Sequence, residues 1–461
     1  MSYAAIALDL GTTSIKAGLL DQNGALCHVI SHSAPAIIAD GGRYESDALA
    51  YAEATEQVLD ECIAQAGECR TLGMCSQRSS FLIWEQASGQ PITPLISWQD
   101  NRGAASCEFL QPHEEFIRDH AGLPLTPYYF APKLSVVLLD NPAWKERLER
   151  GELRLGTLDT FLIWRWTEGR HFVTDASMAA RTLLMDIKQQ QWSPPLCALF
   201  DIPPGILPEI ISSTGLSLRL NNGLSLQASA GDQSAALIGS IANDDREALV
   251  NLGTGGFVVR YLPVDARVTK GYLHTLVYQD IEHRLHFAIE GTINSIAAAL
   301  APYPVDECLA EDFAQDDIFC TAEPSGMGAP YFRGDIGIRF SQPVDQLSQN
   351  RIAVLLLEGI IFRVVRILEA FHRECAIERV YLSGGLSGLI CLQQGIAQCI
   401  PFAVHHLRES ESSLAGVALL AAGMTPTKHS QSERVLLKGS AQAMKQKYQR
   451  WKVWLDELLM S

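Results

Sequence analysis

Residues 4–20, AAIALDLGTTSIKAGLL, decide the fold class of this 461-residue chain. Two apolar runs flank the turn Gly11-Thr12-Thr13-Ser14, and the first run ends at Asp9. Short apolar runs on either side of a glycine-containing turn are typical of a β-hairpin. We therefore predict a strand before the turn, a second strand over residues 15–20 and a third over residues 26–30.

The same pattern recurs in the second half of the chain. Residues 249–260, LVNLGTGGFVVR, again form an apolar run, a Gly-Thr turn and a second apolar run. A chain of this length suits two or three domains, and a repeated unit indicates two domains built on one plan. Hairpins occur in any antiparallel sheet, so the repeat alone leaves duplication open. We expect domains at residues 1–240 and 241–425, followed by a C-terminal helical extension over residues 426–461.

Helical and strand-like segments alternate between and after these hairpins. Helical spacing covers residues 46–66, 351–376, 411–422 and 444–459, whereas strand-like runs cover residues 72–74, 81–84, 161–166 and 380–382. Such alternation predicts an α/β protein in which helices pack on sheets. The segment 411–422 is rich in small residues, which favours close packing on a sheet, and 444–459 is expected to clamp onto the body of the protein.

The composition excludes several classes of partner. Hydrophobic residues make up 47% of the chain and charged residues 19%, as in ordinary globular proteins. The net charge of -16 argues against a nucleic-acid-binding surface, which is usually basic. The apolar run 352–371 carries four charged side chains and is predicted to be a core helix rather than a membrane span.

The cysteines indicate a reducing compartment. The chain has 11 cysteines and no C-x-x-C pair, and no secretory signal is visible before the first predicted strand. We expect reduced thiols, a cytoplasmic protein, and neither a nucleic-acid nor a membrane partner. A homodimer is one assembly that such a chain could form.

Three glycine-rich turns are candidates for phosphate binding. They lie at residues 11–14, 253–256 and 383–388, each directly after an apolar run, and neither a P-loop nor a G-x-G-x-x-G motif is present. Glycines let backbone N–H groups approach phosphate oxygens, and threonine hydroxyls add donors. Any one turn could be purely structural, but three in this position favour phosphate recognition.

Asp9 and Asp232 are the candidate catalytic carboxylates. Asp9 precedes a glycine turn, where a carboxylate can hold Mg²⁺ through water. Asp232 follows an apolar run and a glycine at the start of a small-residue helix. Phosphoryl transfer needs charge neutralisation and one carboxylate that accepts the hydroxyl proton, and these two residues could divide the roles. Helix capping is an equally good interpretation of Asp232 taken alone.

A series of motifs resembles the FGGY family of carbohydrate kinases, and among them the glycerol-kinase-like members. The matching motifs occur in family order from about residue 4 to about residue 425. They are residues 8–16, 73–78, 96–102, 156–164, 174–182, 231–233, 253–255, 290–291, 328–331 and 383–385.

The resemblance implies two actin-like, ribonuclease-H-like domains with an interdomain cleft. It also implies an ATP- and Mg²⁺-dependent kinase that phosphorylates a hydroxyl of a small sugar or polyol, with Asp232 as the general base and Asp9 associated with Mg²⁺. On the acceptor side, mainly in the first domain, the matching residues are Arg78, Trp98, Tyr128, Asp232, Gln233 and Phe257. On the nucleotide side they are Thr12, Thr13, Ser14 and Lys16 in the first phosphate loop, and Thr254, Gly255, Gly384 and Gly385 in the second domain.

Ser79 departs from the resembled pattern. In glycerol kinases the arginine that matches Arg78 is followed by a glutamate that binds substrate hydroxyls, so Ser79 removes a strong acceptor and leaves room for a larger sugar. Two alternatives to an active kinase stay open: a catalytically impaired sensor of sugar or nucleotide, at which Ser79 hints, and an actin-like nucleotide switch of the same fold. For Arg102 and Arg181, pairing with Asp100 and Asp175 is the favoured interpretation over contact with substrate.

Overall fold

The computed structural model describes residues 2–263, 266, 270–408, 411–425 and 432–460. The chain divides into two compact units. Unit 1 comprises Met1–Gly239, Thr275–Phe287 and Glu411–Thr427, and unit 2 comprises Ser240–His274, Ala288–Ser410 and Lys428–Ser461. The chain first crosses from unit 1 to unit 2 between Gly239 and Ser240, next to the domain boundary expected after residue 240. The segments 275–287 and 411–425, however, pack with unit 1 although they are distant from most of it in sequence, and residues 432–460 pack with unit 2.

The main sheet of unit 1 begins with the predicted hairpin. Strands β1 (Tyr3–Leu10), β2 (Ser14–Asp21) and β3 (Leu26–Ser33) form an antiparallel meander. Strands β6 (Thr71–Ser76) and β15 (Ser225–Gly231) continue the sheet parallel to β1, and β14 (Thr214–Arg219) closes it antiparallel to β15. The strand order is β14-β15-β6-β1-β2-β3.

The main sheet of unit 2 repeats this plan. Strands β16 (Glu247–Leu252), β17 (Gly256–Tyr261) and β19 (Leu285–Ile293) form the antiparallel part. Strands β22 (Arg379–Ser383) and β23 (Ala403–Leu407) run parallel to β16, and β24 (Ser432–Arg434) is antiparallel to β23. Strand β18 (Leu273–Gln279) adds one strand beside β19. Each sheet thus contains three antiparallel strands in a row, then two strands that run parallel to the last of these three, and then one antiparallel strand. This shared strand order confirms the duplicated plan.

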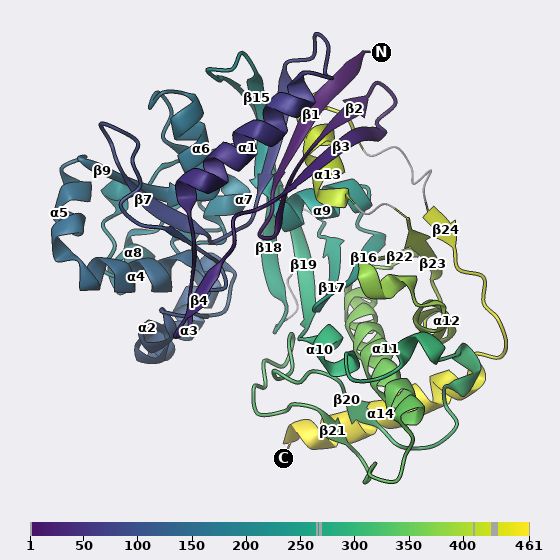
Figure 1. Cartoon of the computed structure of the whole chain (residues 1–461). Coiled ribbons are helices and arrows are strands. Elements are labelled where there is room, and N and C mark those ends of the chain that lie inside the picture. The colour runs from purple at the N-terminus through teal and green to yellow at the C-terminus, as the bar shows by residue number, and fades with distance from the viewer. Residues whose placement is uncertain (1, 264–265, 267–269, 409–410, 426–431, 461) are drawn as a thin grey trace. The chain divides into compact units, whose positions relative to one another are not determined.

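Helices α1 (Ala48–Ile63) and α13 (Ser412–Ala422) cover opposite faces of the sheet in unit 1 (Figure 1). Alternate residues of β1 show this, because Ile6 and Leu8 belong to the core cluster that contains α1, whereas Ala5 and Ala7 pack with α13. A Cβ at Gly73 of β6 would lie 2.3 Å from the carbonyl oxygen of Val417. The small-residue helix therefore packs directly on the sheet, as predicted.

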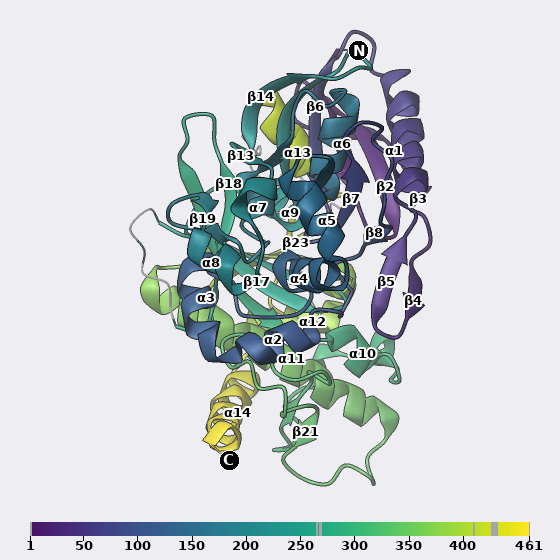
Figure 2. The same ribbon diagram turned by 90° about the vertical axis from the view of Figure 1, so that its left-hand side faces the viewer.

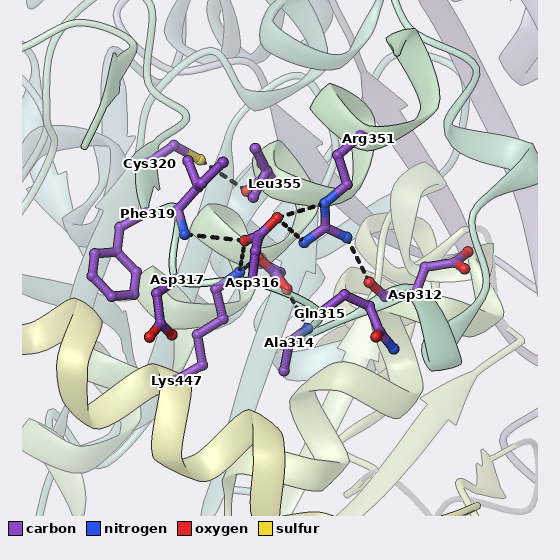
Figure 3. Close-up of polar contacts among 12 residues, drawn as sticks. Asp312, Ala314, Gln315, Asp316, Asp317, Phe319, Cys320, Arg351, Leu355 and Lys447 are labelled. Carbon is purple, nitrogen blue, oxygen red and sulfur yellow. Dashed lines mark hydrogen bonds and ion pairs between the residues drawn. The ribbon is translucent and has the colours of Figure 1, made fainter. Parts of the chain in front are cut away.

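The core of unit 2 is built around α11 (Gln349–Glu374), which is the predicted core helix with charged residues. The terminal helix α14 (Gln442–Met460) is fastened to it by polar contacts that Figure 3 shows. Lys447 Nζ lies 3.0 Å from Asp316 Oδ1 and 2.5 Å from Glu358 Oε2, and Arg351 Nε donates to Asp316 Oδ2 at 2.8 Å. Trp451 Nε1 also donates to Cys320 O at 2.8 Å. The predicted clamping of the terminal helix is confirmed.

One predicted strand is wrong. Residues 161–166 belong to α6 (Leu158–Trp166), in which only Arg165 is not buried. A helix that is apolar on all sides has no 3.6-residue alternation, so its aromatic and β-branched residues resemble a buried strand.

The remaining elements are short. In unit 1 the strands are β4 (Ile38–Asp40), β5 (Arg43–Ser46), β7 (Phe81–Glu85), β8 (Leu95–Ile96), β9 (Leu153–Thr157), β10 (Val173–Asp175), β11 (Met185–Asp186), β12 (Gln191–Trp192) and β13 (Glu209–Ile211). Its helices are α2 (Ala104–Leu110), α3 (Glu114–Ala121), α4 (Phe130–Asp140), α5 (Pro142–Glu149), α7 (Ala176–Ala179), α8 (Pro194–Leu199) and α9 (Asp232–Ser240), several of which Figure 2 shows from the side. Unit 2 adds α10 (Ile296–Leu300), α12 (Ile390–Cys399), β20 (Cys320–Thr321) and β21 (Arg339–Phe340).

The cysteines are free thiols in the structure. Among the described residues, no helix combines the length and the apolar character that a membrane crossing would require.

Candidate active site

The strand register of unit 1 brings Asp9, Arg78 and Asp232 to one edge of the sheet. Leu10 of β1 lies opposite Ser76 of β6, and Ser76 lies opposite Gly231 of β15. Because the three strands are parallel, the residues at or just after their carboxyl ends emerge at the same edge, which is where open α/β sheets bind ligands. Sheet topology therefore brings together three of the residues that the sequence predicts for the site.

Asp232 and Arg78 form an ion pair at this edge. Arg78 Nε lies 3.3 Å from Asp232 Oδ1, which also accepts a hydrogen bond of 2.7 Å from Gln233 N. A Cβ at residue 231 would lie 2.7 Å from Arg78 Cδ, so glycine there leaves room for the arginine. Burial raises the pKa of the Asp232 carboxyl, and the Arg78 charge opposes that rise. The side chain remains 34% exposed, so a ligand can reach the carboxylate.

Asp9 has one oxygen that is hydrogen-bonded and one that is not. Its Oδ2 accepts a hydrogen bond of 2.6 Å from Ser413 Oγ, at the start of α13. Its Oδ1 is buried and accepts no hydrogen bond from any residue that the structure describes. Burial raises the pKa of Asp9 to about 6, the Ser413 hydrogen bond lowers it, and the Asp232 charge raises it further. An unpartnered carboxylate oxygen in this place fits a hard cation or its water ligands.

The first glycine turn is tied to its surroundings by side chains from elsewhere. Trp98 Nε1 donates to Thr12 Oγ1 at 3.0 Å, and Tyr51 OH donates to Gly11 O at 2.6 Å. Lys16 Nζ lies 2.7 Å from Glu411 Oε2. A neighbouring carboxylate neutralises this lysine in the structure, and a phosphate group would have to share or replace that contact.

Thr13 and Ser14, the other predicted nucleotide-side residues of this turn, connect the turn to β2. The Thr13 carbonyl accepts a hydrogen bond of 3.0 Å from Ala34 N, and Ser14 is the first residue of β2. A Cβ at Gly11 would lie 2.6 Å from Ser14 O, so the tightness of the turn requires glycine at this position.

The acceptor-side aromatic residues are open to solvent. Trp98 is 40% exposed and Tyr128 is 44% exposed, and Gln233 is also exposed. Aromatic side chains commonly line small-molecule sites. Ser79, by contrast, is buried, has φ 63°, and donates its hydroxyl to the Arg181 carbonyl at 3.0 Å. Ser79 therefore offers no carboxylate and directs its one hydroxyl to the backbone.

Unit 2 holds the remaining predicted residues at the corresponding edge of its own sheet. Asn251 of β16 lies opposite Ser383 of β22, so the turn with Thr254 and Gly255 and the turn with Gly384 and Gly385 follow adjacent parallel strands. A Cβ at Gly384, where φ is 87°, would lie 2.5 Å from Leu252 O, whereas a Cβ at Gly385 would meet nothing within 4 Å. The first glycine lets the turns pack together, and the second leaves its backbone open to a ligand.

Phe257 stands apart from the other acceptor-side residues. It lies on β17 in unit 2 and is half-buried, whereas the other five acceptor-side residues belong to unit 1. In unit 1 the sheet edge gathers Asp9, Arg78, Asp232 and the first glycine turn, and Trp98 is hydrogen-bonded to that turn.

Two family models together cover most of the chain. The N-terminal domain of the FGGY family of carbohydrate kinases matches residues 4–250, and the C-terminal domain of the same family matches residues 248–424. The chain belongs to the FGGY family of carbohydrate kinases. It is therefore a phosphotransferase with an alcohol group as acceptor, and kinases of this family use ATP.

The relatives of this FGGY kinase are similar over nearly their whole length. A glycerol kinase from Alkalilimnicola ehrlichii is 32% identical over 91% of the chain and 90% of its own length. A glycerol kinase from Haemophilus influenzae is 31% identical over 90% of the chain and 88% of its own length.

Solved structures share the fold. A Plasmodium falciparum glycerol kinase with ADP superposes with a TM-score of 0.85 at 21% identity, covering 98% of this chain and 97% of that one. A xyloylose kinase from Brucella ovis superposes with a TM-score of 0.84 at 20% identity, covering 99% of both chains. At such identities the likeness confirms the two-domain actin-like fold.

Arg102 and Arg181, for which the sequence offered both a structural pairing and a substrate contact, differ in their surroundings in this FGGY kinase. Arg102 donates from Nε to Asp100 Oδ1 at 2.7 Å and also contacts Glu45, which confirms its predicted structural pairing. The Arg181 charge lowers the pKa of Asp232, so this arginine acts on the candidate base. The pairing of Arg181 with Asp175 stays a prediction.

Sequence reasoning missed the residues that support the site from a distance. Ser413 and Glu411 contact Asp9 and Lys16 from the start of α13, and Gln77 Oε1 accepts hydrogen bonds from Ser80 Oγ at 2.9 Å and Thr12 Oγ1 at 3.3 Å. Polar residues at the start of a small-residue helix were the available signal for Glu411 and Ser413. That signal did not reveal their partners, which lie about 400 residues earlier in the sequence.

Proposed function

We propose that this FGGY kinase transfers the terminal phosphoryl group of ATP to a hydroxyl of a small sugar or polyol, with Asp232 as the general base. The observation that carries the proposal is the convergence of Asp9, Arg78 and Asp232 at the carboxyl ends of three parallel strands. The two carboxylates differ in environment, and such a difference suits two separate roles.

Asp232 is suited to take the proton from the attacking hydroxyl. The Arg78 guanidinium, 3.3 Å away, opposes the effect of burial on the pKa of Asp232 and so favours the ionised form that can accept a proton. A general base works best when its pKa is not far below the working pH. Burial raises the pKa of Asp232 and so brings it closer to that pH. Arg78 also offers guanidinium donors to acceptor hydroxyls beside the base.

Asp9 is suited to hold Mg²⁺, directly or through water. Its buried Oδ1, which has no hydrogen-bond partner among the described residues, is the group that would face the ion. When bound, Mg²⁺ supplies charge neutralisation to the phosphoryl oxygens of ATP. Lys16 lies in the adjacent turn and would contribute a second positive charge on release from Glu411.

The nucleotide would lie against the glycine turns of unit 2. The open backbone at Gly385 and the exposed hydroxyl-bearing residue Thr254 support this assignment, because both offer hydrogen-bond donors to phosphate oxygens. Thr12, Thr13 and Ser14 are proposed to do the same in unit 1.

The acceptor would rest on Trp98 and Tyr128, with Gln233 and Phe257 as further contacts. Aromatic faces pack well against the C–H groups of polyols and sugars, and these two rings are exposed. Relatives named glycerol kinases make glycerol one candidate acceptor. Ser79, however, directs its hydroxyl to Arg181 O and supplies no carboxylate to a triol, which favours a larger acceptor with its own extra contacts.

A coupled assay of ADP formation across acceptors tests the function. The panel should contain glycerol, erythritol, xylulose, ribulose, fuculose and sedoheptulose, each with ATP and Mg²⁺, and the matched control omits the acceptor. We expect one acceptor, or a small related group, to stimulate ADP formation and to yield a phosphorylated product by mass spectrometry. If every member of a broad panel leaves ADP formation at the acceptor-free rate, the proposed function is wrong. Calorimetric binding of a sugar without turnover would instead indicate an impaired sensor.

A further inference from the structure

Lys133 is a buried lysine in the helix that follows the candidate acceptor-side residue Tyr128. It lies in the first turn of α4, and its side chain is fully buried. A charged side chain in such a place carries a substantial desolvation cost unless its contacts offset it. The contacts of the Lys133 ammonium therefore indicate the role of this lysine.

The Lys133 ammonium joins two separate loops. Nζ donates to the carbonyl oxygen of Ser79 at 2.8 Å and to the carbonyl oxygen of Ser97 at 2.8 Å. Ser79 directly follows Arg78, and Ser97 directly precedes Trp98. One amine thus fastens the backbone beside two of the candidate acceptor-side residues, and its own helix begins two residues after a third, Tyr128.

These hydrogen bonds hold an unusual backbone conformation. Ser79 has φ 63°, a conformation that residues other than glycine adopt at a cost, so surrounding contacts must maintain it. The hydroxyl of Ser80 links the same two loops a second time, because it accepts a hydrogen bond of 2.9 Å from Trp98 N. Lys133 and Ser80 together hold the loops in one register.

The position of Lys133 is poorly explained by stability alone. Its ammonium donates to two main-chain carbonyls rather than to a carboxylate, and burial lowers its pKa to about 7. The charge of Asp100 raises that pKa and the charge of Arg102 lowers it. An apolar residue could fill the same space, but it could not link the two carbonyls.

We propose that Lys133 is a positioning residue for the acceptor, which sets the spacing of Arg78, Trp98 and Tyr128 through the backbone of the loops that carry them. This inference rests on the proposed function, because it assigns those three residues to the acceptor. Lys133 itself would touch neither the acceptor nor ATP. Small displacements of positioning groups can reduce turnover strongly, so the effect should be selective for the acceptor.

The test compares Lys133→Met, Lys133→Gln and wild type in the full-length protein. Methionine keeps the length of the side chain without donors, and glutamine keeps uncharged N–H donors. Thr167→Val is a matched control, since Thr167 is equally buried and also donates to a carbonyl, that of Ile163 at 2.7 Å, at the end of α6. Two measurements are made: steady-state kinetics with varied acceptor and with varied ATP, and amide hydrogen exchange of peptides that cover residues 77–81 and 96–99.

We expect Lys133→Met to lower kcat/KM for the acceptor by about 10- to 100-fold, with the KM for ATP within about twofold of wild type. Exchange should rise in both loop peptides and little elsewhere, and Lys133→Gln should recover part of both effects. Thr167→Val should leave the KM for the acceptor and exchange in the two loops unchanged. If the Met variant does not fold, the Gln variant is compared with wild type in the same way.

Two results would overturn the inference. The first is that, in both variants, the KM for the acceptor and the amide exchange of the two loop peptides equal the wild-type values. The other is a loss that affects both substrates equally together with faster exchange throughout unit 1, which would indicate a merely structural lysine. If wild type phosphorylates no acceptor, the proposed function fails, and the exchange measurement alone then decides whether Lys133 orders the two loops.

Discussion

At the residue scale, the main contrast lies between two carboxylates at one sheet edge. Asp9 is half-buried, with one oxygen bound to Ser413 and the other, which is buried, without a hydrogen-bond partner among the described residues. Asp232 is partly exposed and paired with Arg78. Such a difference separates a carboxylate that can hold a cation from one that can take a proton. The two groups also influence each other, because the charge of Asp232 raises the pKa of Asp9.

The hydrogen bond from Ser413 predicts a pH effect. The proposed role of Asp9 toward Mg²⁺ requires the ionised carboxylate, and its pKa is raised to about 6, so activity should rise as the pH rises through that value. The Ser413 hydrogen bond lowers this pKa, so Ser413→Ala should raise it and shift the acidic limb of kcat/KM for Mg²⁺-ATP upward by about one pH unit. Pre-steady-state or steady-state pH profiles would measure the shift.

Ser413→Thr is the matched control for that experiment. Threonine keeps a hydroxyl at the same place, so its acidic limb should stay close to that of wild type. A limb that does not move in Ser413→Ala would show that Asp9 ionisation does not limit activity in this pH range.

At the element scale, the strands and turns could be predicted well because their signals are local. Apolar runs that end at glycine turns located β1, β2, β16, β17 and β22, and the small-residue segment became α13. The strand predicted at residues 161–166 was wrong because a helix buried on all sides lacks the amphipathic alternation that distinguishes a helix from a strand. Contacts such as Ser413 to Asp9 and Lys133 to Ser79 could not be predicted, since they depend on which distant elements the fold brings together.

Helix α14 yields a prediction about stability. Lys447 is fully buried between Asp316 and Glu358, so Lys447→Met would leave the buried Glu358 without its cation, whereas Asp316 would keep Arg351. We expect the free energy of unfolding of unit 2 to fall by about 3–5 kcal/mol at neutral pH. Burial already raises the pKa of Glu358 and the Lys447 charge opposes that rise, so Glu358 should protonate more readily in the variant and the loss should shrink toward acidic pH.

Urea unfolding at several pH values would measure this loss. Lys445→Met is the control, because Lys445 lies two residues away on the same helix and is exposed. Equal stability of the two variants at neutral pH would contradict the assigned role of the Lys447 network.

At the scale of the whole molecule, the chain repeats one sheet plan, and each copy presents loops at the carboxyl ends of its parallel strands. The repeated Gly-Thr hairpins indicated this duplication in the sequence, and the two sheets confirm it. The family motifs identified the phosphoryl chemistry more closely than the acceptor. The reason is physical: glycine turns and carboxylates occupy short local motifs, whereas the proposed acceptor residues lie on or beside loops, such as those around Ser79 and Trp98, whose positions are set by tertiary contacts.

The division of roles between the units predicts how ATP turnover depends on the acceptor. The proposed glycine turns for the nucleotide lie in unit 2, and most proposed acceptor residues lie in unit 1. A kinase must keep water from replacing its acceptor, so ATP hydrolysis without acceptor should be slower than transfer by roughly tenfold or more. Measuring ADP formation with and without a saturating acceptor checks this, and a fast acceptor-independent ATPase would contradict it.

The assignment of Asp232 as the general base is the central claim, and Asp232→Asn tests it most directly. Asparagine keeps the size of the side chain and an oxygen that can accept the Gln233 N–H, but it cannot take a proton. The measurement is kcat for phosphoryl transfer to the preferred acceptor, with the Kd for Mg²⁺-ATP measured by calorimetry in parallel. We predict a loss of kcat of about 10²–10⁴-fold with the Kd changed by less than about threefold. Turnover within a few-fold of wild type in the folded variant would contradict the claim.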